Sequence, residues 1–195
     1  MENPFDAGYY HSEELRTFGF AEVGDDVMIA RNCTIIGLPN ISIGHNVRID
    51  GGTTIAAARG RCSIGSFIHI GGGCHLACVS DVTLEDFTGL SQGVKLYSAS
   101  DDYSGRSLTN PTIPPEFQTI HSAPIRLGRH VIIGSGSVIL PGVHIGEGSS
   151  VGALSLVGKS LDPWGIYSGI PVRRVKDRRK DLLASEAQLL QSRGL

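Results

Sequence analysis

Residues 127–157 read LGRHVI-IGSGSV-ILPGVH-IGEGSS-VGALSL-V, and an aliphatic residue opens every block of six. A fixed period of this kind indicates a repeat architecture. The second place of a block is mostly Gly, Ala, Asp or Glu, and the fifth place is small or aliphatic. In an extended chain the first and fifth places point to the same side, so each block predicts a short strand followed by a corner.

The same period covers most of the chain, in eighteen blocks. The phase slips by two or three residues after Ile35, Ile55 and Leu76, always after three blocks. Three strands therefore close one coil, and the sequence predicts an all-β fold, a parallel β-helix shaped as a triangular prism of about six coils. The aliphatic openers are Val23, Ile29, Ile35, Ile43, Ile49, Ile55, Ile64, Ile70, Leu76, Leu84, Leu90, Leu96, Leu127, Ile133, Ile139, Ile145, Val151 and Val157.

Composition narrows the range of partners. The 195 residues carry a net charge of −2, which argues against a nucleic-acid-binding surface. The longest apolar runs fall short of the roughly 18 residues of a membrane span, and the start of the chain, residues 1–4, lacks the order of a secretion signal. We therefore expect a cytoplasmic protein that contacts neither nucleic acid nor membrane.

Three segments are expected along the chain. Residues 1–20, with a short helix start at 12–15, should form an N-terminal cap over the first coil. The β-helix should span residues 21–170, interrupted by a loop at 101–124. Long loops that leave a regular scaffold usually carry function. Residues 171–195 should form a C-terminal basic segment and helix.

Two kinds of chemistry are expected to be absent. Residues 89–93 match the GxSxG pattern of a hydrolase nucleophile, Ser91, but the repeat already accounts for them. His69 and His75 stand one block apart, which places them on different faces of the prism. We expect the other histidines of the repeat, His45, His130 and His144, on outer surfaces. No metal site is therefore predicted.

The segment 155–174, SLVGKSLDPWGIYSGIPVRR, resembles the acetyl-CoA-binding end of galactoside and other sugar O- or N-acetyltransferases. Over residues 20–176 the chain resembles the hexapeptide-repeat acyltransferases. That resemblance implies a left-handed β-helix, acetyl-CoA as acyl donor, and a homotrimer with a site in each groove between two prisms.

Five cofactor-binding positions follow from the resemblance. Gly134, Ser135 and Ala153 would offer backbone groups to the pantetheine arm. Lys159 and Arg173 would meet the cofactor phosphates, for which cations with free donors are suited. The alternative is that these two are ordinary surface charges.

The catalytic position departs from the family pattern. The family's general base is a His in a context similar to Gly-Ser-His-Asp-Tyr-Ser, and this chain has ASDDYS at 99–104, so Asp101 takes the place of that His. A carboxylate with a pKa of about 3.9 is a poor base for a sugar hydroxyl. A neutral amine needs less help, which favours an amino sugar over a hydroxyl acceptor. Asp102 and His121 are further base candidates, and His121 has the alternative of merely packing the loop.

The acceptor candidates complete the prediction. His69 aligns approximately with an acceptor-contacting Tyr of the galactoside enzymes, and Tyr103 belongs to a loop motif that resembles nucleotide-linked amino-deoxysugar N-acetyltransferases of polysaccharide gene clusters. We expect an acetyltransferase that acts on the amino group of such a sugar for O-antigen or surface polysaccharide synthesis. The alternatives are an O-acetyltransferase of a galactoside-like or polysaccharide hydroxyl and a noncatalytic scaffold.

Overall fold

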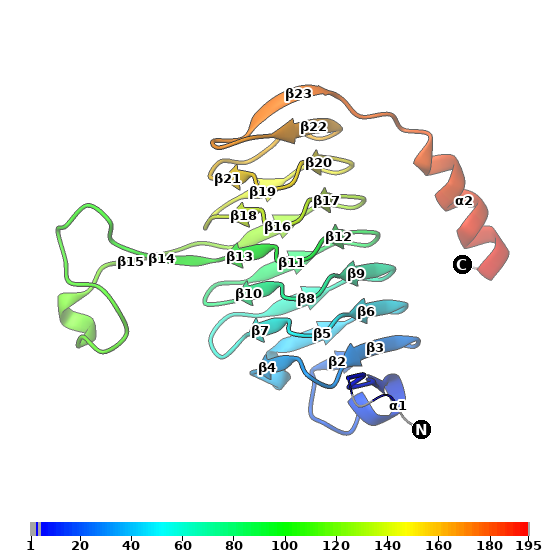
Figure 1. Cartoon of the computed structure of the whole chain (residues 1–195), viewed down its shortest axis with the longest axis horizontal. Coiled ribbons are helices and arrows are strands. Elements are labelled where there is room, and N and C mark those ends of the chain that lie inside the picture. Colours follow the sequence, from blue (N-terminus) through cyan, green and yellow to red (C-terminus); the bar gives the residue numbers. More distant parts are fainter. Residues whose placement is uncertain (1–2, 4, 195) are drawn as a thin grey trace.

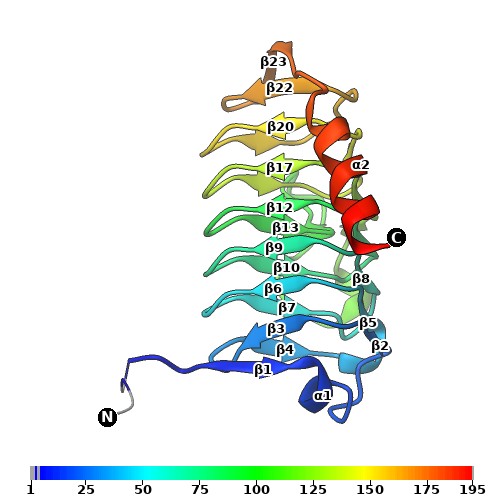
Figure 2. The ribbon, with the colours of Figure 1, turned by 90° about the vertical axis from the view of Figure 1, so that its right-hand side faces the viewer.

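The computed structural model describes residue 3 and residues 5–194, and its main body is a left-handed parallel β-helix (Figures 1 and 2). The all-β fold class predicted from the repeat is confirmed. Three sheets run along the prism, and we call them the A, B and C faces. Each coil contributes one strand to B, then A, then C, and six such coils are followed by the start of a seventh.

The A face holds nine strands, of which the first and last pair antiparallel to their neighbours. In spatial order they are β1 (Tyr9–His11), β3 (Val27–Ala30), β6 (Val47–Ile49), β9 (Ile68–Ile70), β12 (Gly89–Leu90), β17 (Ile132–Ile133), β20 (Ser150–Val151), β22 (Gly165–Ser168) and β23 (Arg173–Asp177).

The other two faces hold six parallel strands each. The B face consists of β2 (Glu22–Val23), β5 (Ile41–Ile43), β8 (Cys62–Ile64), β11 (Val82–Leu84), β16 (Ile125–Leu127) and β19 (His144–Ile145). The C face consists of β4 (Thr34–Ile36), β7 (Thr54–Ala56), β10 (His75–Ala77), β13 (Lys95–Tyr97), β18 (Val138–Ile139) and β21 (Leu156–Val157).

The aliphatic block openers form the interior column. All of them are buried except Ile35, which is half-buried against the core. The phase slips also fall where the sequence predicts, at one corner of the prism, where the chain passes from the C face to the B face. We call this the C–B corner. The 3₁₀ turn Leu38–Asn40 takes up the slack in the first coil.

The N-terminal segment covers the open end of the prism. Strand β1 pairs antiparallel with β3, and helix α1 (Ser12–Leu15) buries Leu15. The A-face edge of the first coil is thereby paired, which hinders its pairing with another chain at that face. Residues 1, 2 and 4 of the predicted cap and residue 195 of the predicted C-terminal segment lie outside the described residues.

The C-terminal basic segment contains a strand before the helix begins. Arg173–Asp177 forms β23, which turns back along β22 and closes the upper edge of the A face. Helix α2 (Leu182–Arg193) then descends along the corner between the B and A faces (Figure 2). Within the described residues no helix is long and apolar enough to cross a bilayer.

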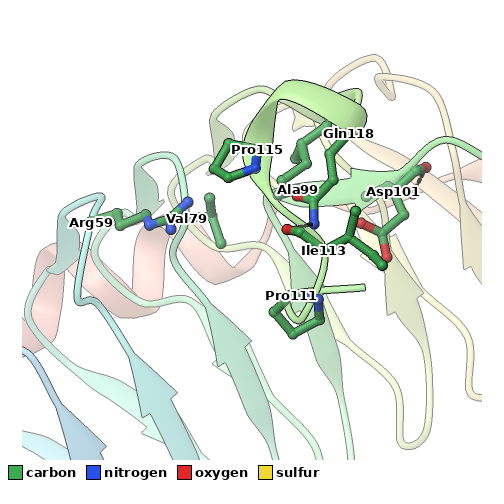
Figure 3. Close-up of a pocket in the computed structure, with 10 residues that line it drawn as sticks. Arg59, Val79, Ala99, Asp101, Pro111, Ile113, Pro115 and Gln118 are labelled. Carbon is green, nitrogen blue, oxygen red and sulfur yellow. Dashed lines mark hydrogen bonds between the residues drawn. The ribbon is translucent and has the colours of Figure 1, made fainter. Parts of the chain in front are cut away.

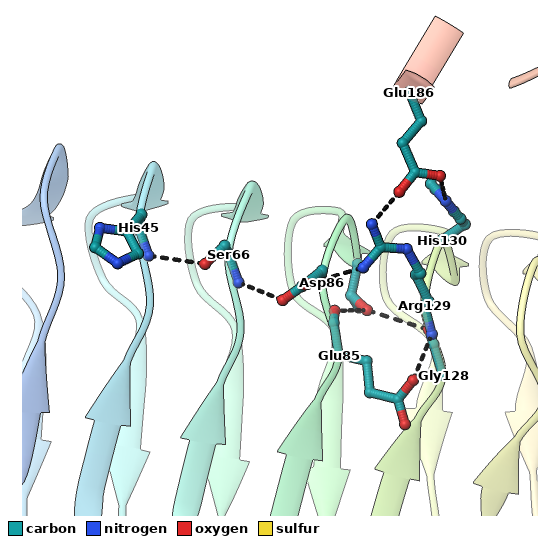
Figure 4. A network of polar contacts seen from close by, with 9 residues as sticks. His45, Ser66, Glu85, Asp86, Gly128, Arg129, His130 and Glu186 are labelled. Atoms are coloured by element: carbon teal, nitrogen blue, oxygen red, sulfur yellow. Dashed lines mark hydrogen bonds and ion pairs between the residues drawn. The ribbon is translucent and has the colours of Figure 1, made fainter. Parts of the chain in front are cut away.

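Helix α2 is held by charged contacts to turns of the prism (Figure 4). Glu186 accepts from Arg129 and lies 2.7 Å from Nε2 of His130. Burial alone would raise the pKa of Glu186, but the hydrogen bonds from Arg129 and His130 outweigh it and hold that pKa below its ordinary value. Arg178 donates to the carbonyl of His130 at 2.8 Å.

The position of α2 corrects one expectation. His130 was expected on an outer surface, yet only 7% of it is exposed, because Glu186 covers it and Phe87 stacks on its ring at 5.0 Å. The packing of α2 against this corner is a tertiary contact, and the six-residue period does not predict it. His45 and His144 do lie on the surface.

Close stacking of the coils generates the first prediction. A Cβ on Gly134 would lie 2.4 Å from the backbone N of Ala153 in the next coil, whereas a Cβ on Gly89 would meet nothing nearer than Cγ1 of Ile132 at 3.8 Å. Gly134→Ala should therefore lower the free energy of unfolding by about 1–3 kcal/mol through overpacking, and thermal unfolding should report a fall of several degrees. Gly89→Ala is the matched control, and equal melting temperatures for the two variants would contradict the close-stacking argument.

Candidate active site

The loop at 101–124 projects from the C–B corner between the fourth and fifth coils (Figure 1). Its base is a two-stranded antiparallel ribbon of β14 (Ala99–Asp101) and β15 (Ile120–Ser122), and the 3₁₀ turn Pro115–Phe117 lies beyond the ribbon. Buried Ser98 anchors the exit point: its hydroxyl lies 2.8 Å from the Ala77 carbonyl and accepts from the backbone N of Ser80 at 2.9 Å. The loop therefore leaves a rigid part of the prism.

The ribbon separates two of the base candidates. Asp101 is paired with Ile120, and His121 is paired with Ser100. Because directly opposed residues share a side and successive residues alternate, Asp101 and His121 lie on opposite sides of the ribbon. The Asp101 carboxylate is exposed and accepts no hydrogen bond from the side chains or backbone of the described residues.

Asp102 is engaged in the loop itself. Its carboxylate accepts from the hydroxyl of Ser104 at 2.6 Å and from the backbone N–H groups of Ser104, Arg106 and Ser107 at 2.9, 2.8 and 3.1 Å. The Ser104 hydroxyl and amide, followed by the other amides, lower the pKa of Asp102 to about 2. A carboxylate this acidic is a weak proton acceptor, so the geometry favours a structural role for Asp102. Tyr103, beside it at the loop tip, is 93% exposed.

A pocket of about 470 Å³ lies between the loop and the C–B corner (Figure 3). Asp101 lies at one end of it and Arg59 at the other, and Val79 and Ile113 lie between them. Arg59 occupies the fifth place of the block that Ile55 opens, where small or aliphatic residues are usual. Its role in a pocket depends on the fold of the loop, which no local pattern around Arg59 reveals.

Three of the cofactor candidates meet at the opposite edge of the C face, the A–C corner, where the chain passes from the A face to the C face. Gly134 and Ser135 belong to the turn after β17, and Ala153 belongs to the turn above it, after β20. Within the described residues the backbone N–H groups of Ser135 and Ala153 have no hydrogen-bond acceptor, and both residues are accessible. The structure thus brings two free donors together at this corner.

The two cationic cofactor candidates lie higher on the prism. Lys159 is exposed at the C–B corner after β21, above the loop, and Arg173 is exposed at the start of β23. The strand β21 separates Lys159 from the Ala153 turn. These five residues therefore border the upper part of the C face without forming one compact cluster.

His69 belongs to a separate polar cluster on the A face. Its Nε2 lies 2.8 Å from Oδ2 of Asp50, and the other oxygen of Asp50 accepts from Arg48 at 2.7 Å and from the hydroxyl of Tyr9 at 2.9 Å. Burial would raise the pKa of Asp50, but the hydrogen bonds from His69, Arg48 and Tyr9 lower it. Within one chain His69 therefore lies on the A face, away from Asp101 at the C–B corner. The described residues contain no group of three or more metal-ligating side chains.

Taken together, this arrangement suits transfer to an amine. An accessible carboxylate stands at a pocket mouth, and free amide donors lie at the other edge of the C face. Among the described residues no Ser or Cys side chain hydrogen-bonds to a histidine ring, and the serine hydroxyls that meet a carboxylate, those of Ser104 and Ser107, meet the weakly basic Asp102, so no covalent route is indicated. All four cysteines are free, and Cys62, Cys74 and Cys78 are buried.

Comparisons with known proteins agree with this arrangement. The family described as bacterial transferase hexapeptide (six repeats) matches residues 124–159. A dTDP-4-amino-4,6-dideoxy-D-glucose acyltransferase of Escherichia coli is 38% identical over 92% of this chain and 93% of its own. The crystal structure of AntD, an N-acyltransferase from Bacillus cereus, in complex with dTDP and 3-hydroxybutyryl-CoA, has a TM-score of 0.92 at 40% identity and covers 96% of this chain and 99% of that one. The galactoside O-acetyltransferase of Escherichia coli is 35% identical over 60% of this chain and 59% of its own.

The Asp102 contacts generate the second prediction. Followed by NMR, the Asp102 carboxyl should titrate with a midpoint near pH 2. Because the folded pKa is lowered, the loop-tip hydrogen bonds are fully present above about pH 4 and are lost as the pH falls through 2. Ser104→Ala, which removes the largest contribution, should move the midpoint upward, and an ordinary midpoint in the unchanged protein would contradict the geometry.

Proposed function

Because this chain belongs to the hexapeptide-repeat acyltransferases, we propose that it transfers an acetyl group from acetyl-CoA to the amino group of a nucleotide-linked amino-deoxysugar, for the synthesis of a surface polysaccharide such as O-antigen. The observation behind the proposal is Asp101: its carboxylate accepts no hydrogen bond from the described residues, lines a pocket at the base of the loop and stands where the resemblance places the family's His. Two relatives that match almost the whole chain support the amino-sugar acceptor: one is named for such a sugar, and a variant of the other was solved in complex with dTDP-4-amino-4,6-dideoxyglucose.

A spacing in one relative supports the choice of Asp101. Solved variants of the Bacillus cereus N-acyltransferase replace a serine and an aspartate that lie ten positions apart, and some of them hold CoA with dTDP-4-amino-4,6-dideoxyglucose. In this chain Ser91 and Asp101 are also ten positions apart. Ser91 stands in the A–C turn of the fourth coil, directly below the turn of Ser135. The serine set aside as a hydrolase nucleophile is therefore a second candidate for acceptor or donor contact.

The residues divide the chemical step as follows. Asp101 orients the neutral amine and receives the proton that the nitrogen loses as it bonds to the acetyl carbon. Acetyl-CoA supplies the thioester carbon, and its sulfur leaves as the carbon–sulfur bond breaks. Within one chain the Ser135 and Ala153 turns lie at the opposite edge of the C face from Asp101, so in the groove between two prisms one prism would provide Asp101 and its neighbour the free N–H of Ser135 or Ala153. That N–H donates to the carbonyl oxygen as negative charge develops there, and such electrostatic stabilisation is usually the largest contribution to catalysis. No covalent acyl-enzyme is needed.

The cofactor-binding candidates fit coenzyme A in chemistry. Gly134 lets successive turns approach closely, so that the N–H groups of Ser135 and Ala153 meet an extended pantetheine arm. Lys159, across the C face from these turns, and Arg173, at the start of β23, have exposed cationic groups for the phosphates. The Arg173 guanidinium makes one hydrogen bond within the described residues, to the neighbouring Val172 carbonyl at 3.1 Å.

A homotrimer is the assembly we expect, with one site between each pair of prisms. Support comes from apolar side chains that face outward beside the cofactor candidates: Ile132 is 45% exposed and Leu154 is 71% exposed. Burial of such side chains would favour association. We place the reaction in the cytoplasm, where four free cysteines are stable as thiols.

The third prediction concerns Asp101. Asp101→Asn should lower acetyl transfer by about 10²–10⁴-fold, the usual contribution of a general base, while calorimetry should show unchanged affinity for CoA. Glu116→Gln makes the same charge change at an exposed position of the same loop and is the matched control. Full activity of Asp101→Asn would remove Asp101 from the mechanism.

The acceptor is tested by incubating the protein with acetyl-CoA and a panel of nucleotide-linked amino sugars and their hydroxyl counterparts, with mass spectrometry of the products. We expect acetylated amino sugars whose acetyl group resists mild alkali, because an amide survives conditions that cleave an ester. An alkali-labile product would instead favour the O-acetyltransferase. Failure to bind acetyl-CoA in calorimetry would favour the scaffold.

A further inference from the structure

The pocket under the loop has a cation at the end opposite Asp101. Arg59 lies in the C–B turn between β7 and β8, and Figure 3 shows its side chain across the pocket from Asp101. The wall between them is mostly apolar and includes Val79, Ile113 and Ile120. The pocket therefore offers a negative group and a positive group at its two ends, joined by an apolar middle.

Arg59 is not neutralised within the described part of the chain. Seven arginines form ion pairs with carboxylates, namely Arg16, Arg31, Arg48, Arg126, Arg129, Arg174 and Arg179. Arg59 has no such partner among the described residues, although Asp101 lines the same pocket. A guanidinium presents five donors in a planar fork, which suits the oxygens of a phosphate.

The pocket wall is built to keep its shape. The side-chain amide of Gln118 donates to the carbonyls of Asn110 and Ile113, at 2.6 and 2.7 Å, so Gln118 fixes the loop wall and does not offer those protons to a ligand. The backbone N of Thr119 donates to the hydroxyl of Ser107 at 3.0 Å. Among the charged groups that line the pocket, only Arg59 and Asp101 remain for ligand contact in the described residues.

We propose that Arg59 binds the diphosphate of the nucleotide-linked acceptor and thereby makes the pocket selective for a sugar that carries a nucleotide over the free amino sugar. This inference rests on the proposed function. A sugar whose amine meets Asp101 holds its glycosidic diphosphate beyond the ring, at the Arg59 end, and the deoxygenated part of the sugar meets the apolar wall. Arg59 is thus a specificity-determining residue and takes no part in the bond changes.

The position of Arg59 separates it from the groups proposed for the acyl donor. Arg59 lies below the loop on the C–B corner, whereas Lys159 lies above the loop on that corner and Arg173 lies on β23. Two anionic ligands can therefore approach the loop from opposite ends of the prism. The amine and the thioester then meet near Asp101, as direct transfer requires.

The fourth prediction compares Arg59→Ala with Arg61→Ala. Arg61 is exposed two residues further along the same turn, and it does not line the pocket. Arg59→Ala should raise the KM for the nucleotide-linked amino sugar by about tenfold to a hundredfold, the usual loss for a charged hydrogen bond, with a smaller change in kcat. The KM for acetyl-CoA should not change. Calorimetry with dTDP as probe should show the same loss of affinity, and Arg59→Lys should restore part of it.

Each contrary result bears on one proposal only. Unchanged dTDP affinity in Arg59→Ala, an equal effect of Arg61→Ala, or a raised KM for acetyl-CoA would overturn the role of Arg59. Equal use of free and nucleotide-linked amino sugar by the unchanged protein would also overturn it, while transfer to either sugar amine would leave acetyl transfer to an amine intact. Absence of acetyl transfer to any amino sugar would overturn the proposed function itself. Melting temperatures of the variants identify any loss of folding.

Discussion

Hydrogen bonding between the backbones of successive coils is the constraint on which the rest of the structure depends. The bonds continue around the corners, as between the N of Gly134 and the carbonyl of Val151 at 2.8 Å. A coil cannot tilt away from its neighbour without losing them, so a residue on the inner side of a corner must be small. The aliphatic openers fill the space that three such strands enclose. Backbone hydrogen bonding fixes the spacing of strands and corners, and the six-residue period places small and aliphatic residues to match that spacing.

This constraint also decides where the chain can carry additional structure. A coil is complete once its C-face strand is formed, so extra residues before the next B-face strand disturb no pairing. The short slips, the Leu38–Asn40 turn and the 101–124 loop all occur at that C–B corner. Arg59 and Lys159 project from the same corner, below and above the loop. The residues proposed to contact the acceptor, Asp101 and Arg59, therefore lie along the edge where the coils vary in length, whereas the amide donors of Ser135 and Ala153 lie at the A–C corner.

The period predicts the core and the class of fold, because a residue in a strand of the prism meets the same neighbours in every coil. It also predicts that His69 and His75 lie on different faces, β9 and β10. Contacts that break the period are not encoded in it. The burial of His130 depends on the position of α2 along the prism. Arg59 lines a pocket only because the 101–124 loop folds back toward the turn that carries Arg59. The cofactor and acceptor positions depend on a ligand that the six-residue period does not encode, so only the resemblance to the family predicts them.

The adjacent carboxylates of Asp101 and Asp102 have different roles in the loop: Asp102 holds the loop turn, and Asp101 is the proposed catalytic group. The Asp102 carboxylate accepts hydrogen bonds from the Ser104 hydroxyl and from three backbone N–H groups. These bonds lower its pKa to about 2, so Asp102 stays charged and bound to the turn. Its neighbour Asp101 is the last residue of β14, so the same backbone that fixes Asp102 also fixes the direction of Asp101 toward the pocket. An unpaired carboxylate is too weak a base for a hydroxyl, yet it suffices to orient an amine and take its proton. The replacement of the family's His by Asp is thus consistent with a change of acceptor from hydroxyl to amine, with the scaffold left unaltered.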